Sequence, residues 1–372
     1  MTLAPAMLRR RLSWILSAYI ARQFLFWLGT FFFSLLGIIL LITLVDLLDK
    51  SSNKQVSFGI VVQLALMKLP FLAQEVMPFT ILFAGMMTFW RLTRSNELVV
   101  VRAAGISVWQ FLLPVLSMGV LVGVLTVGVL NPLASALFSR FELLDARLSE
   151  RKNSVLAVSD KGIWIRQADE VGQTVIHAGR VSSRALILYH VIVFQFGEGD
   201  QFLGRIDARR ARLEKGNWVL NDAWVTVPGE QSVFEETTRL PTNLTTSKIQ
   251  ESFARPETIS VWSLPSFIAL LENAGFSALK HKLRLHRLLA VPLLFTAMLL
   301  LAATFSMRPQ RRGRVATIIL AGVLTGFLLH FLSNFVFALG LSAKIPVILA
   351  AWTPAGICMM LGIAMLLQLE DG

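Results

Sequence analysis

Six apolar stretches, each about twenty residues or longer, dominate this chain of 372 residues. A helix of twenty residues rises about 30 Å, which matches the hydrocarbon core of a bilayer. Hydrophobic residues make up 55% of the sequence and charged residues only 16%, which excludes a soluble globular protein. Asn131 and Pro132 are expected to close the third span. The expected spans are 23–45, 58–90, 108–130, 288–307, 315–339 and 345–367.

The arginines of the short loops are concentrated on one side of these spans. The positive-inside rule places those loops, and both ends of the chain, in the cytoplasm. The first apolar run is too long for the core of a signal peptide, so it is interpreted as a retained first span. The arginines are Arg9, Arg10, Arg11, Arg22, Arg91, Arg94, Arg102, Arg308, Arg311, Arg312 and Arg314.

The formal net charge of +12 belongs to the membrane portion of the chain. Residues 140–272 hold 16 of the 35 basic residues and 17 of the 23 acidic residues. Topology and anionic lipid explain the remaining basic excess, so nucleic acid is not an expected partner.

Between the third and fourth spans the pattern changes to short runs with period-two alternation. From 154 to 246 this pattern indicates antiparallel strands, and the frequent turns favour a jelly roll or an open sandwich. Helical periodicity returns at 259–274, an amphipathic connector expected near the membrane surface. The expected fold is a polytopic α-helical membrane protein with six spans and an inserted extracytoplasmic all-β, jelly-roll-like domain. Its expected parts are 1–140 for the first three spans, 141–279 for the β-domain and connector, and 280–372 for the last three spans.

No motif in the sequence indicates catalysis or metal binding. A phosphate-binding loop of the form GxxxxGK[ST] is absent, so we expect ATP to be hydrolysed by another subunit. His177 and His190 lie in expected strands without a ligand at metal spacing, and no nucleophile motif occurs. Cys358, the single cysteine, is expected to be a small buried residue of the sixth span. The chain is therefore expected to be non-catalytic, with no metal and no cofactor of its own.

A short segment between the second and third spans is the candidate for coupling to a motor. Residues 91–109 read RLTRSNELVVVRAAGISVW, an amphipathic cytoplasmic stretch with an acid, Glu97, among basic residues. Gly105 can end a helix at this point. Two interpretations remain open, a capped surface helix and a docking helix at about 93–106 for a separate ATPase.

The segment NELVVVRAAGIS, residues 96–107, resembles the coupling-helix motif SELVVMRAAG of the LptF/LptG family of lipopolysaccharide export permeases. Other segments resemble the family in the same order along nearly the whole chain, and this order is more specific than any single motif. The Leu-Val-Val form and the Ile-Pro ending favour the LptG branch over the LptF branch. The other segments are YIARQF at 19–24, KLP at 68–70, MPF at 77–79, TNLT at 242–245, KLRLHRLLAVPL at 282–293 and IPVILAAWTPA at 345–355.

This resemblance implies a permease subunit of an ABC-type exporter in the bacterial inner membrane, with its β-domain in the periplasm. The implied partners are an LptF-like homologous permease, an LptB-like ATPase dimer that binds the ATP, LptC-like and LptA-like bridge proteins, lipopolysaccharide and membrane lipid. ATPase coupling falls on Glu97, Arg102 and Gly105. Lateral gates would form from 23–45 and 315–339. The deep helix-one cation that the family often has is missing here.

Cations crowd the outer end of the fourth span, where the positive-inside rule discourages them. One interpretation is snorkelling to ordinary anionic headgroups. The other is a clamp for the phosphates of a glycolipid, and Lys50 and Lys68 at the outer ends of the first two spans would join it. The cations of the fourth span are Lys280, Lys282, Arg284 and Arg287, with His281 and His286 among them.

An acidic residue and two pairs of glycines within the spans each have a structural and a functional interpretation. Glu75 lies in the second span and is a candidate site by default, although contact with a neighbouring helix is the favoured role. Glycines four residues apart predict close helix packing, and in the fifth span a contact with a partner subunit is the alternative. These glycine pairs are Gly119 with Gly123 and Gly322 with Gly326.

Three classes of function compete. A transport subunit that works with a separate ATPase is favoured. An intramembrane enzyme acting on envelope lipids would need a catalytic pair, and Glu75 with His330 is the only conceivable set. An ion-coupled secondary transporter is expected to show inverted repeats, and none is detected.

Overall fold

The computed structural model divides into two compact units, and each is described by itself. The helical unit comprises Met1–Phe141 and Leu283–Gly372, and the β unit comprises Glu142–Lys282. The arginines expected in the loop at 308–314 lie outside the described residues. The structure describes residues 4–51, 57–148, 156–159, 162–168, 173–182, 187–197, 201–214, 216–242, 255–273, 276–307 and 315–371.

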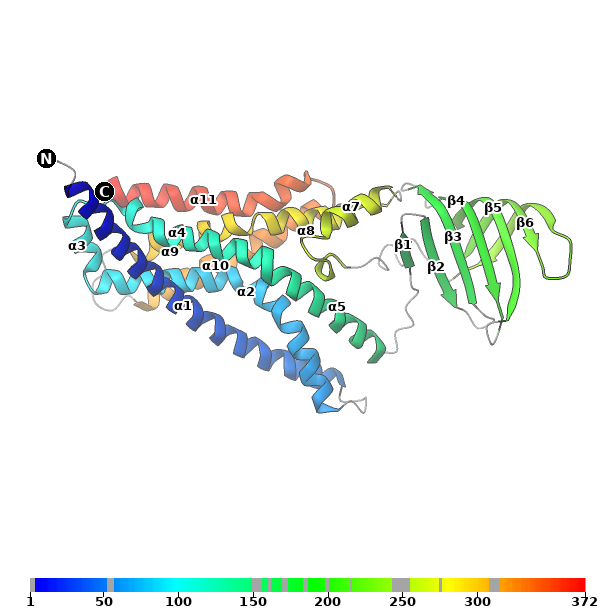
Figure 1. Cartoon of the computed structure of the whole chain (residues 1–372), viewed down its shortest axis with the longest axis horizontal. Helices are drawn as coiled ribbons and strands as arrows, with labels where there is room; N and C mark the ends of the chain where they lie inside the picture. Colours follow the sequence, from blue (N-terminus) through cyan, green and yellow to red (C-terminus); the bar gives the residue numbers. More distant parts are fainter. Residues whose placement is uncertain are drawn as a thin grey trace. The chain divides into compact units, whose positions relative to one another are not determined.

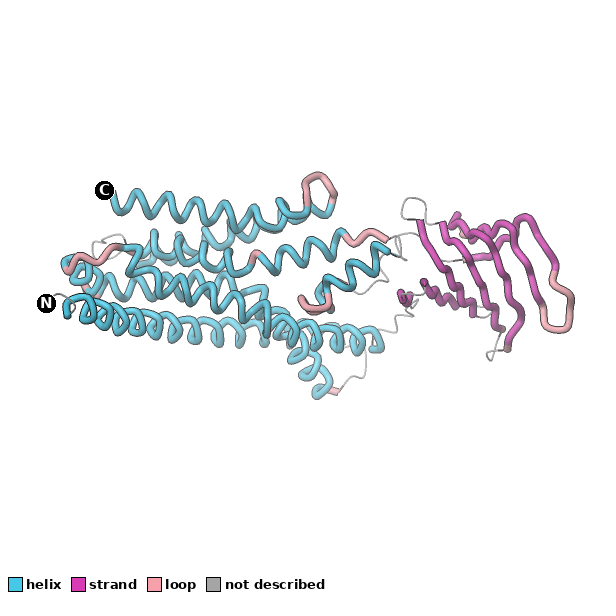
Figure 2. The backbone as a smooth tube through the Cα atoms, turned by 45° about the horizontal axis from the view of Figure 1, so that its top comes forward, coloured by secondary structure: helices cyan, strands magenta, loops and turns pink. Residues whose placement is uncertain are grey.

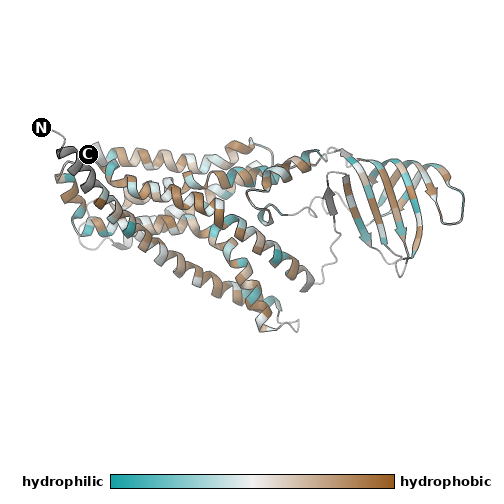
Figure 3. Cartoon of the chain, in the orientation of Figure 1, coloured by the Kyte–Doolittle hydropathy of each residue, from teal (hydrophilic) through white to brown (hydrophobic). Residues whose placement is uncertain are grey.

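Long apolar helices build the helical unit (Figures 1 and 3). Among the described residues, five helices are long and apolar enough to cross a bilayer, and α8 with α9 forms a bent sixth candidate. The membrane fold expected from the sequence is confirmed. The helices are α1 (Ala4–Ser51), α2 (Phe58–Arg94), α3 (Glu97–Ala103), α4 (Val108–Leu125), α5 (Asn131–Leu148), α8 (Leu279–Leu289), α9 (Val291–Ser306), α10 (Val315–Leu341) and α11 (Val347–Asp371).

The beginning of α1 and the end of α11 lie at one end of the helical unit (Figures 1 and 2), and the short helix α3 lies at the same end (Figure 1). An even number of spans brings both ends of a chain to the same side of a membrane. A segment that follows the second span reaches that side as well. The arrangement therefore agrees with six spans.

The third span does not close at Asn131 and Pro132, which corrects the expectation from the sequence. α4 passes through a π-helical turn, Thr126–Leu130, and α5 restarts at Asn131. Proline is tolerated in the first turn of a helical segment, so Pro132 does not end the helix here. Gln74 of α2 donates a 3.5 Å hydrogen bond to the Leu130 carbonyl and accepts a 3.2 Å bond from Asn131. A neighbouring helix thus satisfies polar groups at the irregular turn.

The central helix of this unit is α9, which packs against α2, α4 and α11. The fourth span bends by 48° between α8 and α9, just before Pro292. Glycines allow α4 to lie very close to α9. A Cβ atom on Gly123, which glycine lacks, would lie only 2.6 Å from the Cα of Pro292. One on Gly119 would lie 2.5 Å from a Leu299 methyl group. The close packing predicted from this glycine pair is confirmed.

The second glycine pair lies on α10 and packs within the chain. A Cβ on Gly326 would lie 3.0 Å from the ring of Phe79, and one on Gly322 would clash with Met86, both residues of α2. This intramolecular contact accounts for the spacing without a partner subunit. α10 also presents an exposed apolar surface that includes Phe327 and Phe331.

In its described strands, the jelly-roll-like domain is one antiparallel sheet whose strands follow the order of the sequence (Figure 1). Residues such as Val193, Trp218 and Leu220 are fully buried on its inner face. Two strands, β1 and β7, were not expected, because β1 has only four residues and β7 reads VFEETTRLP with weak alternation. The strands are β1 (Leu156–Ser159), β2 (Gly162–Ala168), β3 (Gln173–Ser182), β4 (Ile187–Phe196), β5 (Phe202–Glu214), β6 (Asn217–Thr226) and β7 (Val233–Pro241).

Along each strand, side chains alternate between the buried face and the exposed face of the sheet. On three adjacent strands this alternation is interrupted at the same level, so that the interruptions form a line across the strands. On β4, β5 and β6 the buried residues beside this line are three positions apart instead of two. His190 and Asp222 lie on it with positive φ values of 53° and 52°. The pairing offset is unchanged across the line. The residues between the buried positions are Tyr189 and His190, Arg209 and Arg210, and Asn221 and Asp222.

The amphipathic connector after the sheet becomes α-helical later than expected. A 3-10 turn covers Pro256–Thr258, and α7 covers only Leu264–Asn273. Pro265 follows the first helical residue, a position where its missing N–H removes no helical hydrogen bond. Ile268 and Leu271 are buried within the β unit.

Candidate docking and lipid-binding sites

α3 is a seven-residue helix that is closed at its C-terminal end by Gly105. The Gly105 N–H donates to the Arg102 carbonyl over 2.9 Å, and the Ile106 N–H donates to the Val101 carbonyl over 3.3 Å. These two bonds are the Schellman pattern, in which the residue after the helix adopts the left-handed region. Gly105 does so, with φ of 79°. Its expected role in ending the helix is confirmed, and this explains why glycine occupies the position.

The side chains of α3 divide into a buried anchor and an exposed surface. Leu98 is buried in the hydrophobic core of the helical unit. Val99 and Val100 are 62% and 67% exposed, and Arg102 is also exposed. An apolar surface beside a charged residue, on a helix fixed at one side, is suited to contact another protein.

Glu97 connects α3 to the first span. One of its carboxylate oxygens accepts hydrogen bonds from the Ser95 hydroxyl over 2.8 Å and from the Tyr19 hydroxyl of α1 over 3.3 Å. The side chain remains only half-buried, so it is still accessible to a partner. The sequence did not reveal Tyr19 as a partner of Glu97, because 78 residues separate them.

The four cations of α8 have different environments. Lys280 is exposed, whereas Lys282 forms an ion pair with Glu272 over 2.5 Å. Arg284 is buried, with 8% exposure. The Arg287 guanidinium lies 5.3 Å from the centre of the Phe337 ring on α10, a cation–π contact. Lys280 and Arg287 are therefore the cations of this helix that are best placed to meet a ligand.

Lys50 and Lys68, the two further cations expected in the phosphate clamp, each contact a side chain of the same unit. Lys50 forms an ion pair with Asp46, one helical turn earlier on α1, over 2.8 Å. Lys68 lies 5.7 Å from the centre of the Phe141 ring. Both remain partly accessible.

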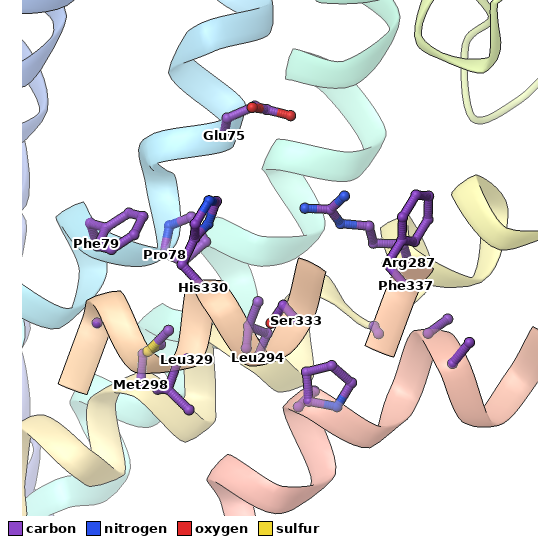
Figure 4. Close-up of a pocket in the computed structure, with 16 residues that line it drawn as sticks. Glu75, Pro78, Phe79, Arg287, Leu294, Met298, Leu329, His330, Ser333 and Phe337 are labelled. Atoms are coloured by element: carbon purple, nitrogen blue, oxygen red, sulfur yellow. The ribbon is translucent and has the colours of Figure 1, made fainter. Parts of the chain in front are cut away.

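A cavity of about 70 Å³ lies between α2, α8, α9, α10 and α11. Figure 4 shows Glu75 of α2, Arg287 of α8 and His330 of α10 around the same space. The sequence singled out Glu75 and His330, but no spacing predicted that Arg287 would join them. Ser333, Phe79 and Phe337 also line this cavity.

The remaining candidate residues named from the sequence, His177 and Cys358, take part in packing. His177 packs against Trp164, with ring centres 4.4 Å apart. Cys358 is buried, as expected. Within the part of the chain that the structure describes, no group of three or more histidine, cysteine or acidic side chains could hold a metal.

Comparisons with known proteins agree with this arrangement. The family profile described as "Lipopolysaccharide export system permease LptF/LptG" matches residues 18–368. The lipopolysaccharide export system permease proteins LptG of Escherichia coli K12 and of Escherichia coli O6:H1 are each 21% identical over 366 residues. Each comparison covers 95% of this chain and 98% of the relative. Because the family match extends over nearly the whole sequence, the chain belongs to the LptF/LptG family of lipopolysaccharide export permeases.

Proposed function

We propose that this permease, a transmembrane subunit of a lipopolysaccharide exporter in the bacterial inner membrane, is driven by a separate ATPase that docks on α3. The observation that carries the proposal is the construction of α3. It is capped by Gly105, anchored by Leu98, and presents Val99, Val100 and Arg102 outward beside Glu97. A short, rigid helix of this kind can transmit a rigid-body movement into the membrane helices.

The topology proposed for this function has α3 and both ends of the chain in the cytoplasm and the β unit in the periplasm. The position of the short-loop arginines supports it. The proposed partners are an LptF-like permease, an LptB-like ATPase dimer, and LptC-like and LptA-like bridge proteins. The LptG names of the two relatives and the Leu-Val-Val motif favour the LptG role over the LptF role. The chain itself is proposed to bind neither nucleotide nor metal.

The purified chain alone is expected to hydrolyse no ATP. The reason is the absence of a phosphate-binding loop from its sequence. Turnover should appear when the nucleotide-binding subunit and the homologous permease are added. Phosphate release measured before and after this addition tests the expectation, and copurification of an ATPase with the tagged chain tests the docking. ATP hydrolysis by the pure chain would contradict the proposal.

The accessible cations of α8, exposed Lys280 and half-buried Arg287, are proposed to hold phosphates of the glycolipid. Changing Lys280 and Arg287 together to glutamine should reduce lipopolysaccharide crosslinking several-fold, because charge-assisted hydrogen bonds to phosphate are strong. Assembly with the partner subunits should be unchanged, since both side chains are accessible.

A matched control for this pair is Lys344→Gln, which removes an exposed cation from the loop between α10 and α11. Crosslinking should be normal in this variant. Normal lipid loading in an assembled Lys280 and Arg287 double variant would instead support snorkelling to ordinary headgroups.

A further inference from the structure

The cavity bordered by Glu75, Arg287 and His330 contains opposite charges that do not neutralise each other. Among the described residues, neither Glu75 nor Arg287 forms an ion pair. Arg287 instead contacts the Phe337 ring. Unpaired charged groups in membrane-spanning helices are costly and indicate a functional site or a ligand.

The charges come from different helices, and both of them line this cavity. Glu75 lies on α2 and Arg287 on α8, while Figure 4 shows the guanidinium directed into the space that His330 and Glu75 border. Glu75 and His330 are exposed, and Arg287 and Ser333 are half-buried. The cavity is therefore open on the side of Glu75 and His330.

Two further residues that line the cavity, His330 and Ser333, carry groups that can donate hydrogen bonds. The Asn334 amide lies 2.9 Å from Nε2 of His330 and fixes the imidazole ring. When this amide donates to Nε2, the other ring nitrogen, Nδ1, carries the proton and is a donor. The Ser333 hydroxyl also lines the cavity. Arg287, His330 and Ser333 together suit a phosphate, and Arg can bind phosphate through two parallel bonds.

A simple anion or a simple cation does not fit this set of charges. A lone phosphate would be repelled by the Glu75 carboxylate, and a lone ammonium would be repelled by Arg287. A ligand that carries a phosphate and an ammonium a few atoms apart satisfies both. One ordered water needs about 10–15 Å³ of such space. The cavity volume of about 70 Å³ thus admits a small polar head, while acyl chains remain outside.

We propose that this cavity binds the phosphoethanolamine group of a lipid, with its phosphate toward Arg287, His330 and Ser333 and its ammonium toward Glu75. The group could belong to phosphatidylethanolamine or to a glycolipid modified with phosphoethanolamine. The proposal rests on the lipid-handling role proposed above, and it adds a preference for a zwitterionic head over an anionic one.

The test uses the intact complex of the full chain with its partner subunits and requires no variant in its first arm. Native mass spectrometry compares phosphatidylethanolamine with phosphatidylglycerol of identical acyl chains. Phosphatidylethanolamine should bind roughly tenfold more tightly, the effect of one charge-assisted hydrogen bond. Phosphatidylcholine, which lacks ammonium N–H donors, should bind less well than phosphatidylethanolamine. Equal binding of all three lipids would overturn the proposal.

Variants identify the site in the second arm. Glu75→Gln should remove the preference for phosphatidylethanolamine, and Arg287→Gln should weaken binding of phosphatidylethanolamine and phosphatidylglycerol. Glu230→Gln and Lys344→Gln change exposed charges outside the cavity and should preserve the preference. A preference that survives Glu75→Gln would contradict the assignment to this cavity.

A third arm distinguishes the two sources of the head group. Lipid A with and without phosphoethanolamine is titrated against the unaltered protein and the Glu75→Gln variant. A gain from the modification that depends on Glu75 supports the glycolipid as a source, and Glu75-dependent binding of phosphatidylethanolamine supports the phospholipid. Absence of Glu75 dependence for both lipids rejects the site. ATPase docking is measured in a separate experiment with Glu97→Ala. The lipid-binding result can therefore be interpreted whether or not that variant loses docking.

Discussion

Glu97→Ala is expected to dissociate or uncouple the ATPase from the permease. Glu97 is half-buried beside the exposed valines of α3, where a carboxylate can accept paired hydrogen bonds from an arginine of the motor. Truncating one partner of a desolvated charge pair costs about 2–5 kcal/mol. ATPase copurification and lipopolysaccharide release should both fall sharply, although Glu97 lies outside the proposed lipid cavity. A solvated surface acid would give little change.

Two further variants separate docking from the internal contacts of Glu97. Tyr19→Phe removes only the hydrogen bond from α1 and should preserve docking. If Tyr19→Phe reproduced the loss, the contact between α1 and α3 would be the important one. Glu97→Lys should be rescued by a charge reversal on the motor. Normal assembly and release in both Glu97→Ala and Glu97→Lys would show that Glu97 is not the coupling contact.

Gly123→Leu is expected to prevent correct packing of the helical unit. Even a Cβ at this position would lie 2.6 Å from the Cα and 3.1 Å from the backbone nitrogen of Pro292. Backbone at the bend of the fourth span cannot move aside as a side chain can. Overpacking of a tight interior costs roughly 1–3 kcal/mol, and a leucine here should exceed that range. The thermal midpoint and the yield of the purified protein in detergent measure the effect.

Glycines elsewhere in the spans provide graded controls. The Cβ introduced by Gly119→Ala would contact the flexible end of the Leu299 side chain. This variant should therefore lower the thermal midpoint less than Gly123→Ala. Gly37→Ala on α1 has open space around it and should be neutral or slightly stabilising, because alanine favours helix. Equal midpoints for Gly123→Ala and Gly37→Ala would show that α4 and α9 are not closely packed through this position.

The sequence predicted features that depend on local or periodic patterns. Among the described residues, five candidate spans and the bent sixth candidate followed from length and hydropathy, and the end of α3 followed from Gly105. Most strands followed from alternation. β7 was missed because it lies at the edge of the described sheet and exposes polar residues on both faces. The coupling and phosphate-binding roles of the named side chains remain predictions.

Features that depend on distant partners were not predictable. Pro132 signals the end of a helix unless a neighbour supports the backbone, and that neighbour, Gln74, is 56 residues from the bonded carbonyl. The cavity joins side chains from α2, α8 and α10, which no spacing in the sequence relates. The ion pair of Lys282 with Glu272, which identifies Lys282 as a cation already paired with an acid, likewise became known only from the structure.

The line of interrupted alternation across β4, β5 and β6 constrains how the β unit can vary. Because β4, β5 and β6 each carry their additional outward residue at the same level, the pairing offset stays constant across the line. Deleting one residue from a single strand would move half of that strand out of phase with both neighbours. Length changes in this region are therefore tolerated only when they are matched on adjacent strands. The three strands must gain or lose residues together, whereas their loops can change independently.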